Sequence, residues 1–206
     1  MAEYGRIVRA GAAAGADLVF FETFTDLYEL KAALLAAKEN CTLPILASMS
    51  FEAGGRTFTG CTVESFAVTA RGLGADAVGI NCSLGPKEIF PMAKRLAEAL
   101  PGDFPVFVKP NAGLPRADGS GYDITPQLFA MEMKPYRELK LFAAGGCCGT
   151  TPDFIRLLNG VFADCRPGRA AHAMPSVLCS PMDFVTVRPA VTLLAASTHP
   201  TCWGFP

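Results

Sequence analysis

Two adjacent cysteines, Cys147 and Cys148, stand in a glycine-rich segment that could carry out metal chemistry. Neighbouring side chains of a regular strand point to opposite faces, so both thiols can serve one site only where the backbone turns sharply. Gly145, Gly146 and Gly149 permit such a turn, because glycine tolerates positive φ. Thiols between a strand end and a helix N-terminus are well placed to ionise, and the thiolate is the form that binds metals. A metal site would still need a third ligand from elsewhere in the chain.

A helix is expected directly after this segment, at 152–161. Thr150 or Thr151 can cap its first turn, Pro152 suits the first helical position, and Asp153 favours the positive end of the helix dipole. These signals place the two cysteines between the end of a strand and the start of a helix.

Cys82 is the candidate for the third ligand, because it directly follows another expected strand, at 75–81. The carboxyl ends of parallel strands in a curved sheet converge on one face, so we expect Cys82 to approach the pair. Three thiolates with one open position form the ligand set of a catalytic zinc ion. Two other interpretations remain open at this point. A cysteine at a strand end is often only a small buried residue, and 145–150 could instead cradle a phosphate.

Strand and helix patterns alternate along the chain at a spacing of roughly 25–35 residues, which is typical of βα units in a parallel sheet. The strands are short and apolar, as in sheets covered on both sides. Polar and glycine residues gather just after the strands, where parallel α/β proteins hold their sites. The fold class is therefore α/β. Strands are expected at 17–21, 43–50, 75–81, 105–109 and 141–144, and helices at 3–15, 26–40, 63–73, 86–100, 125–139 and 152–161.

Composition excludes several classes of function. The chain has 206 residues, of which 50% are hydrophobic and 18% charged, enough to build a core. Its formal net charge of −1 gives no reason to expect nucleic acid or a charged membrane surface as a partner. No apolar run approaches about 20 residues, so no membrane span is expected. Without an export signal, the eight cysteines are interpreted as reduced thiols in the cytoplasm rather than a disulfide framework.

The segments 79–83 and 145–150 together resemble the zinc-binding signature of the homocysteine S-methyltransferase family. The details are most similar to the homocysteine-binding module of cobalamin-dependent methionine synthases, and the likeness extends over 3–158. The family fold is a (β/α)8 TIM barrel. Further segments fit the family in the same order, namely 22–24, Gly60 and 109–113.

The resemblance implies that Cys82, Cys147 and Cys148 bind Zn2+ and that the homocysteine thiol takes the fourth position. A free thiol is mostly protonated at neutral pH, and zinc would convert it to a nucleophilic thiolate. That thiolate would take a methyl group and give methionine. Methylcobalamin, recharged by methyltetrahydrofolate, is the donor expected from the resemblance, and some relatives use a sulfonium or betaine donor.

Three side chains are candidates for contacting the substrate. Glu22 ends the first expected strand and, by the resemblance, would accept a hydrogen bond from the substrate ammonium; it could instead cap the helix that begins near Asp26. Asn81 lies inside the signature and is also expected to contact substrate. Asn111 could orient substrate or simply close the turn after Pro110, and the turn is the favoured interpretation.

The pattern gives five strands, whereas the family barrel has eight. The expectation is a partial barrel of about five C-terminal βα units at 1–163, truncated at its N-terminus, followed by a linker and loosely ordered tail at 164–206. Cobalamin- and folate-bearing domains would be absent from this chain. Open sheet edges invite self-association, and methyl transfer would be impaired. The alternatives are a noncatalytic remnant that binds zinc or homocysteine, and a TIM-barrel enzyme for a phosphorylated substrate.

Overall fold

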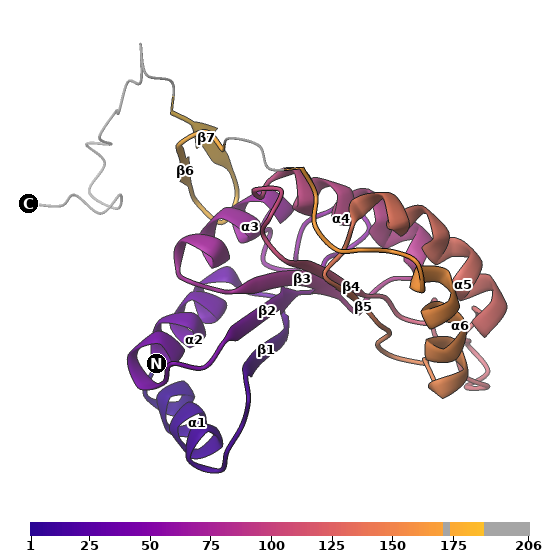
Figure 1. Cartoon of the computed structure of the whole chain (residues 1–206), viewed down its shortest axis with the longest axis horizontal. Coiled ribbons are helices and arrows are strands. Elements are labelled where there is room, and N and C mark those ends of the chain that lie inside the picture. Colours follow the sequence, from indigo (N-terminus) through magenta and orange to yellow (C-terminus); the bar gives the residue numbers. More distant parts are fainter. Residues whose placement is uncertain (171–173, 188–206) are drawn as a thin grey trace, which may run out of the picture.

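The computed structural model describes residues 1–170 and 174–187. Its centre is a five-stranded parallel sheet in the order β1-β2-β3-β4-β5, and each strand pairs with the next one along the chain (Figure 1). The strands are β1 (Val19–Phe24), β2 (Ile45–Met49), β3 (Ala77–Asn81), β4 (Val106–Lys109) and β5 (Ala143–Ala144). The helices are α1 (Ala2–Ala13), α2 (Leu27–Asn40), α3 (Val63–Gly72), α4 (Pro86–Glu98), α5 (Pro126–Met133) and α6 (Pro152–Phe162), with a 3-10 helix η1 (Lys134–Leu139) after α5.

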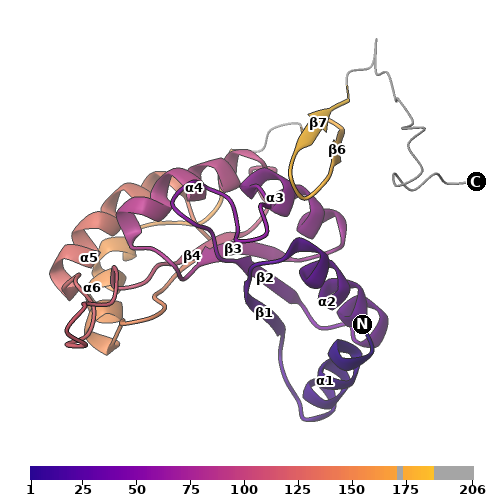
Figure 2. The same ribbon diagram turned by 180° about the vertical axis from the view of Figure 1, so that it is seen from behind.

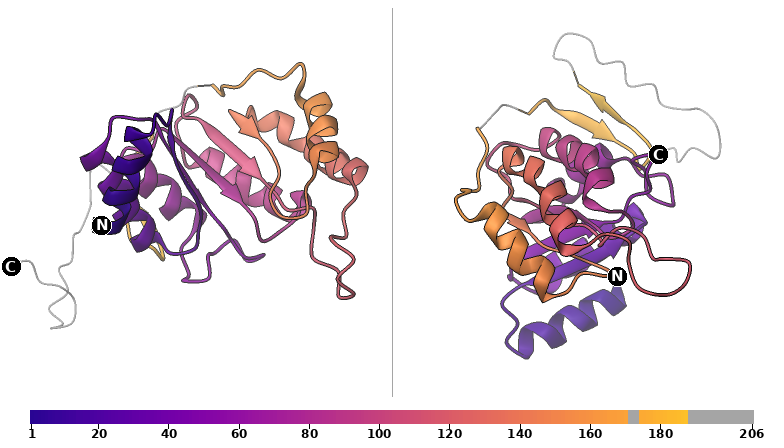
Figure 3. Two further views of the ribbon diagram at one scale, coloured as in Figure 1. Left: turned by 90° about the horizontal axis from the view of Figure 1, so that it is seen from below. Right: turned by 90° about the vertical axis from the view of Figure 1, so that its right-hand side faces the viewer.

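The helices line one side of the curved sheet, and α1 and α6 lie at opposite ends of the arc (Figures 1 and 2). A view from below looks onto the concave side, which no helix of the described part of the chain covers (Figure 3, left). This is the arrangement of consecutive βα units in part of a TIM barrel, where helices form an outer ring. Every residue of β3, the middle strand, is buried. The predicted α/β class is confirmed.

The first strand is longer than predicted and contains an irregularity. Pairing with β2 runs regularly from Val19 to Phe21, shifts, and resumes at Phe24. Between them Thr23 has a φ of 66°, a left-handed conformation that is uncommon outside glycine. The strand thus extends through Glu22 and Thr23, beyond the expected end at residue 21.

The single helix expected at 125–139 is interrupted after Met133 and continues as η1. Pro135 explains the change, because proline has no N–H to donate to residue 131 and its ring crowds the preceding turn. Lys140 then ends the segment in a left-handed conformation with a φ of 49°.

The tail that was expected to be loosely ordered forms a short hairpin in its described part. The strands β6 (Val177–Cys179) and β7 (Phe184–Thr186) pair in antiparallel fashion beside α3 (Figure 1). The N–H of Thr62 donates to the Pro181 carbonyl at 3.1 Å. Each strand has only three residues, too few for a periodic pattern to show in the sequence. Positions 171–173 and 188–206 of the tail lie outside the described residues.

Hydrogen bonds of Arg169 join the start of the expected linker to the βα units. Its guanidinium donates to the carbonyl of Ala97 in the last turn of α4 and to the carbonyls of Pro101 and Phe104 in the loop that follows. A cation at this end of a helix satisfies free carbonyls and complements the helix dipole. The division of the chain at 163/164 stays a prediction.

The end strands β1 and β5 each have one partner in the described sheet. Apolar side chains are exposed near both, Leu18 beside β1 and Phe142 beside β5. Self-association through these edges stays a prediction. Within the described residues, no helix is both long enough and apolar enough to cross a membrane.

Replacing Gly79 by alanine is expected to lower the free energy of unfolding by about 1–3 kcal/mol, the usual cost of overpacking a core. A Cβ at this position in β3 would meet the Phe107 ring at 2.3 Å and its carbonyl oxygen at 2.6 Å. Gly160→Ala in α6 is the matched control, because its Cβ would meet nothing within 4 Å. Helix propensity predicts a gain of about 0.5–1 kcal/mol there. Urea denaturation measures both, and equal stabilities for the two variants would contradict this account of Gly79.

Candidate metal centre

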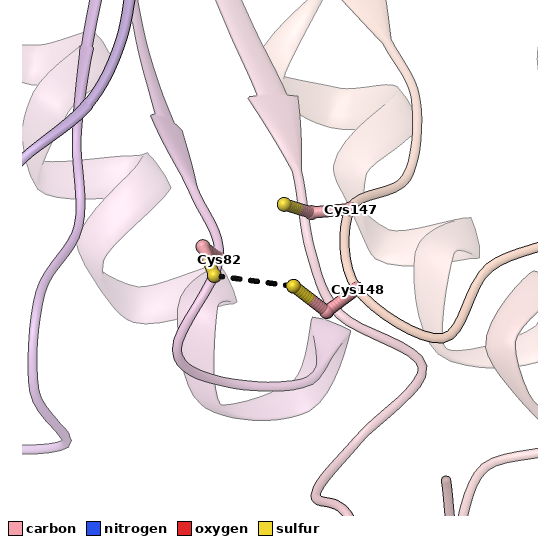
Figure 4. Close-up of side chains that lie close together, drawn as sticks. All are labelled: Cys82, Cys147 and Cys148. Atoms are coloured by element: carbon pink, nitrogen blue, oxygen red, sulfur yellow. Dashed lines mark hydrogen bonds between the residues drawn. The ribbon is translucent and has the colours of Figure 1, made fainter. Parts of the chain in front are cut away.

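Three cysteine sulfurs from distant parts of the chain meet at one rim of the sheet. Cys82 follows β3, and Cys147 and Cys148 follow β5 (Figure 4). All three sulfurs lie within 4.8 Å of one another, and those of Cys82 and Cys148 are 3.7 Å apart. Two sulfurs bound to one tetrahedral zinc ion at the usual bond length are about 3.8 Å apart. The cluster therefore has the spacing of a three-thiolate metal centre.

A tight turn directs Cys82 toward the pair. Cys82 and Ser83 have φ values of 65° and 61°, left-handed conformations that cost energy outside glycine. The N–H of Leu84 donates to the Cys82 carbonyl at 2.8 Å and closes a three-residue turn. The Ser83 hydroxyl lies 2.6 Å from the hydroxyl of Ser50, which follows β2. These bonds hold the strained turn against its neighbours.

The cysteine-bearing loop uses its own backbone donors inside the protein. This leaves few N–H groups for a phosphate and speaks against a phosphate cradle. Gly149 has a φ of 78°, and a Cβ there would meet the Tyr122 ring at 2.3 Å. The N–H groups of Gly145, Cys147 and Thr150 donate to the carbonyls of Val108, Pro110 and Cys147, at 2.9, 2.8 and 3.2 Å respectively. The Cys148 N–H donates to the Asn111 Oδ1 at 3.1 Å.

Neither threonine caps α6 with its side chain, so that prediction was wrong. Thr151 occupies the N-cap position without a side-chain hydrogen bond. The Thr150 hydroxyl instead donates to the Cys147 carbonyl at 2.7 Å. The sharp turn explains this, because it brings that carbonyl within reach of the hydroxyl. Pro152 and Asp153 do stand in the first turn, as predicted.

Asn111 joins the two cysteine-bearing turns. Its side chain is buried, and its Oδ1 accepts the bond from the Cys148 N–H. Its own N–H donates to the Leu84 carbonyl at 2.9 Å, beside the turn of Cys82. Both contacts reach distant parts of the chain rather than the turn after Pro110, so closing that turn and contacting substrate both stay predictions.

Glu22 forms an ion pair with Lys109, whose ammonium also lies 5.3 Å from the centre of the Phe20 ring. Helix α2 is capped by Asp26, which accepts a bond from the Glu29 N–H at 2.8 Å. The alternative that Glu22 caps this helix is therefore wrong. The Lys109 pairing was missed from the sequence, although Lys109 stands at the end of β4 within the segment 109–113.

Asn81 is fully buried at the end of β3, and its amide touches the cluster. Its Nδ2 lies 3.7 Å from the Cys147 sulfur and 2.6 Å from the Thr23 hydroxyl. Its Oδ1 accepts a bond from the Ser48 hydroxyl at 2.8 Å. Thr23 and Ser48 were not singled out in the sequence, because no pattern marks a lone hydroxyl at a strand end.

The charge state of Cys82 follows from its surroundings. Burial raises the pKa of this thiol to about 11; a backbone hydrogen bond at Ser83 acts to lower it, and the nearby Cys147 and Cys148 act to raise it. The protein groups alone thus favour the neutral thiol at pH 7.

Comparison with known proteins relates the chain to one family. A family model described as Homocysteine S-methyltransferase matches residues 1–162. Methionine synthase from Mycobacterium leprae is 34% identical over 175 residues, which cover 81% of this chain. Methionine synthase from Mycobacterium tuberculosis is 36% identical over 172 residues, which cover 79% of this chain. In both cases the chain spans 14% of the length of the relative.

Superposition on solved structures relates this chain to one fold. The homocysteine methyltransferase MmuM from Escherichia coli, in its apo form, superposes with a TM-score of 0.62 at 23% identity, over 77% of this chain and 57% of that one. A putative dihydrodipicolinate synthetase from Pseudomonas aeruginosa gives 0.51 at 19% identity, over 76% of this chain and 54% of that one. The predicted partial TIM barrel is confirmed by this likeness in fold.

Replacing Asn111 by leucine is expected to lower the free energy of unfolding by about 0.5–1.5 kcal/mol, the net value of a typical internal hydrogen bond. The reason is that the Cys148 N–H loses its acceptor. Thermal denaturation of Asn111→Leu beside the parent chain checks the assignment, and a variant as stable as the parent would refute it.

Proposed function

The chain belongs to the homocysteine S-methyltransferase family, and from this premise we propose that it binds zinc through Cys82, Cys147 and Cys148 and transfers a methyl group to homocysteine, giving methionine. One observation carries the proposal: three sulfurs from two strand ends lie within 4.8 Å of one another. Their spacing and chemistry fit zinc, which takes thiolate ligands and in catalytic sites keeps one position for substrate.

When bound, zinc would lower the pKa of a thiol in the open position and so supply a nucleophilic thiolate at neutral pH. The chain's own part is to hold three ligands at one rim and leave the fourth position to homocysteine. Cys148 is the exposed member of the three, and Cys82 and Cys147 are partly buried. An incoming thiol would therefore approach from the side of Cys148.

Glu22 is the proposed acceptor for the ammonium group of homocysteine. Its carboxylate already pairs with an ammonium, that of Lys109, and it is partly exposed. A substrate ammonium could exchange with Lys109 at this carboxylate without any new charge being buried. Asn111 would act mainly by keeping the Cys148 loop in place.

Methylcobalamin is the proposed methyl donor, carried by another domain or protein. The curated relatives reported above are methionine synthases, and this chain spans only 14% of their length. Donor-bearing and folate-bearing units would then be partners of the homocysteine-binding unit.

A second candidate is a unit that binds zinc and homocysteine without transferring a methyl group. The observation that favours it is that the parallel sheet of the described residues has five strands, where a complete barrel has eight. Part of the wall around the substrate would have to come from elsewhere, so we expect weak methyl transfer by this chain alone. The phosphate alternative is less favoured, because the donors of the 145–150 loop are bonded internally.

The purified chain is expected to hold about one zinc ion and to lose most of it in Cys82→Ser, because a site needs all three thiolates. Cys165→Ser is the matched control, since Cys165 lies outside the cluster and is likewise partly buried. Elemental analysis gives the metal content, and methionine formed from homocysteine and methylcobalamin gives the activity.

The outcomes separate the two candidates. Zinc together with methionine formation, both lost in Cys82→Ser, supports the methyltransferase. Zinc without methionine supports the binding unit. Equal zinc content in the parent chain and Cys82→Ser would overturn the metal centre itself.

A further inference from the structure

We propose that Asn81 is a positioning residue for the metal ligand Cys147, held by a network of hydroxyl groups, rather than a contact for the substrate. This inference rests on the proposed function, because it concerns the geometry of the same three-thiolate centre. It departs from the expectation that Asn81 touches homocysteine.

A polar network links side chains of three adjacent strands next to the cluster. Asn81 ends β3, Ser48 lies in β2, and Thr23 lies in β1. Asn81 and Ser48 are completely buried. The Ser48 hydroxyl donates to the Asn81 Oδ1 at 2.8 Å, and the Asn81 Nδ2 donates to the Thr23 hydroxyl at 2.6 Å. The Thr23 N–H reaches back to the Ser48 hydroxyl at 3.4 Å, which closes the ring.

The hydrogen bonds of this ring use one of the two N–H groups of the Asn81 side-chain amide and leave the other for the cysteine cluster. An asparagine amide has two N–H donors; one serves the Thr23 hydroxyl, and the Cys147 sulfur lies 3.7 Å from the same nitrogen. Asn81 is therefore the side chain through which this network reaches a proposed metal ligand. Partners of this kind orient ligands and adjust their electron density.

The direction of the amide follows from the same contacts. In the observed orientation Ser48 donates to the carbonyl oxygen, and the N–H groups face Thr23 and Cys147. In the reversed orientation the carbonyl oxygen would face Cys147, and as a ligand thiolate this sulfur would be an acceptor without a proton to share. The Ser48 and Thr23 hydroxyls can each donate or accept, so the sulfur is the partner that discriminates, and a metal-bound Cys147 favours the observed orientation.

The irregularity in β1 has a role in this arrangement. Thr23 takes a φ of 66° where the pairing with β2 shifts, and its hydroxyl is within hydrogen-bonding distance of Asn81. Strained backbone of this kind persists where surrounding contacts determine it, and it clusters at functional sites. Asn81 is enclosed by these contacts and is fully buried, so little of it is left to meet a substrate.

The test measures binding of Co2+, a spectroscopic substitute for zinc, by the whole chain. Asn81→Ala removes the amide donor, and Asn81→Asp replaces the amide with a carboxylate of the same shape. Loss of such an outer partner typically weakens metal affinity by about 10–100-fold. The thiolate-to-cobalt absorption should also move to longer wavelength, because a sulfur without its N–H donor gives up charge more easily.

Thr23→Val is the matched control, because it deletes a polar group of the same ring but leaves the N–H that faces Cys147. Its cobalt affinity should fall by less than about tenfold, and its absorption should stay in place. Ser48→Ala covers the case in which both Asn81 variants fail to fold. It removes the hydroxyl that donates to the Asn81 Oδ1, a bond that Thr23→Val keeps, so the amide is no longer held with its N–H toward Cys147. Cobalt binding should weaken in Ser48→Ala, and the thiolate-to-cobalt absorption should shift.

Cobalt binding and absorption at parental values in Asn81→Ala, or in Ser48→Ala if the Asn81 variants do not fold, would overturn the positioning role while leaving the metal centre standing. A parent chain that binds no cobalt or zinc would overturn the proposed function, and this inference with it. Weaker binding with a shifted band in Asn81→Ala, and an unshifted band in Thr23→Val, supports the proposal.

Discussion

The parallel direction of the strands is the constraint on which the rest of this molecule depends. Because β3 and β5 run the same way in one curved sheet, the residues that follow them leave at the same rim. Cys82 and Cys148, 66 positions apart in the chain, thereby come within 3.7 Å. No disulfide or ion pair is needed for this approach, since it follows from the register of β3, β4 and β5.

Holding the thiols at that rim requires local strain. Thr23, Cys82 and Ser83 all take left-handed conformations near the strand ends, which cost roughly 1–3 kcal/mol each. Buried polar groups stabilise these turns where apolar packing would not fix their direction. Ser48, Ser50, Asn81 and Asn111 are among the few buried polar residues, and each bonds to one of these turns, to the cysteine loop or to a partner that does. The core thus changes from apolar to hydrogen-bonded as it nears the cysteines.

The elements that the sequence predicted well are those with a strong local signal. The alternating βα pattern predicted the parallel sheet, and the glycines around Cys147 and Cys148 allowed for a turn that brings both thiols to one side. The prediction that Cys82 lies near them rested on the convergence of parallel strand ends. The misses lie where tertiary contacts outweigh local preference. Nothing local marks the left-handed Thr23, and the carbonyl that draws the Thr150 hydroxyl away from α6 is within reach only after the loop has folded.

X-ray absorption at the zinc edge of the purified chain tests the central claim most directly. The account predicts three sulfur neighbours at about 2.3 Å, rising to four when homocysteine is added. A shell of nitrogen and oxygen alone, or a sulfur count that does not change with homocysteine, would contradict it.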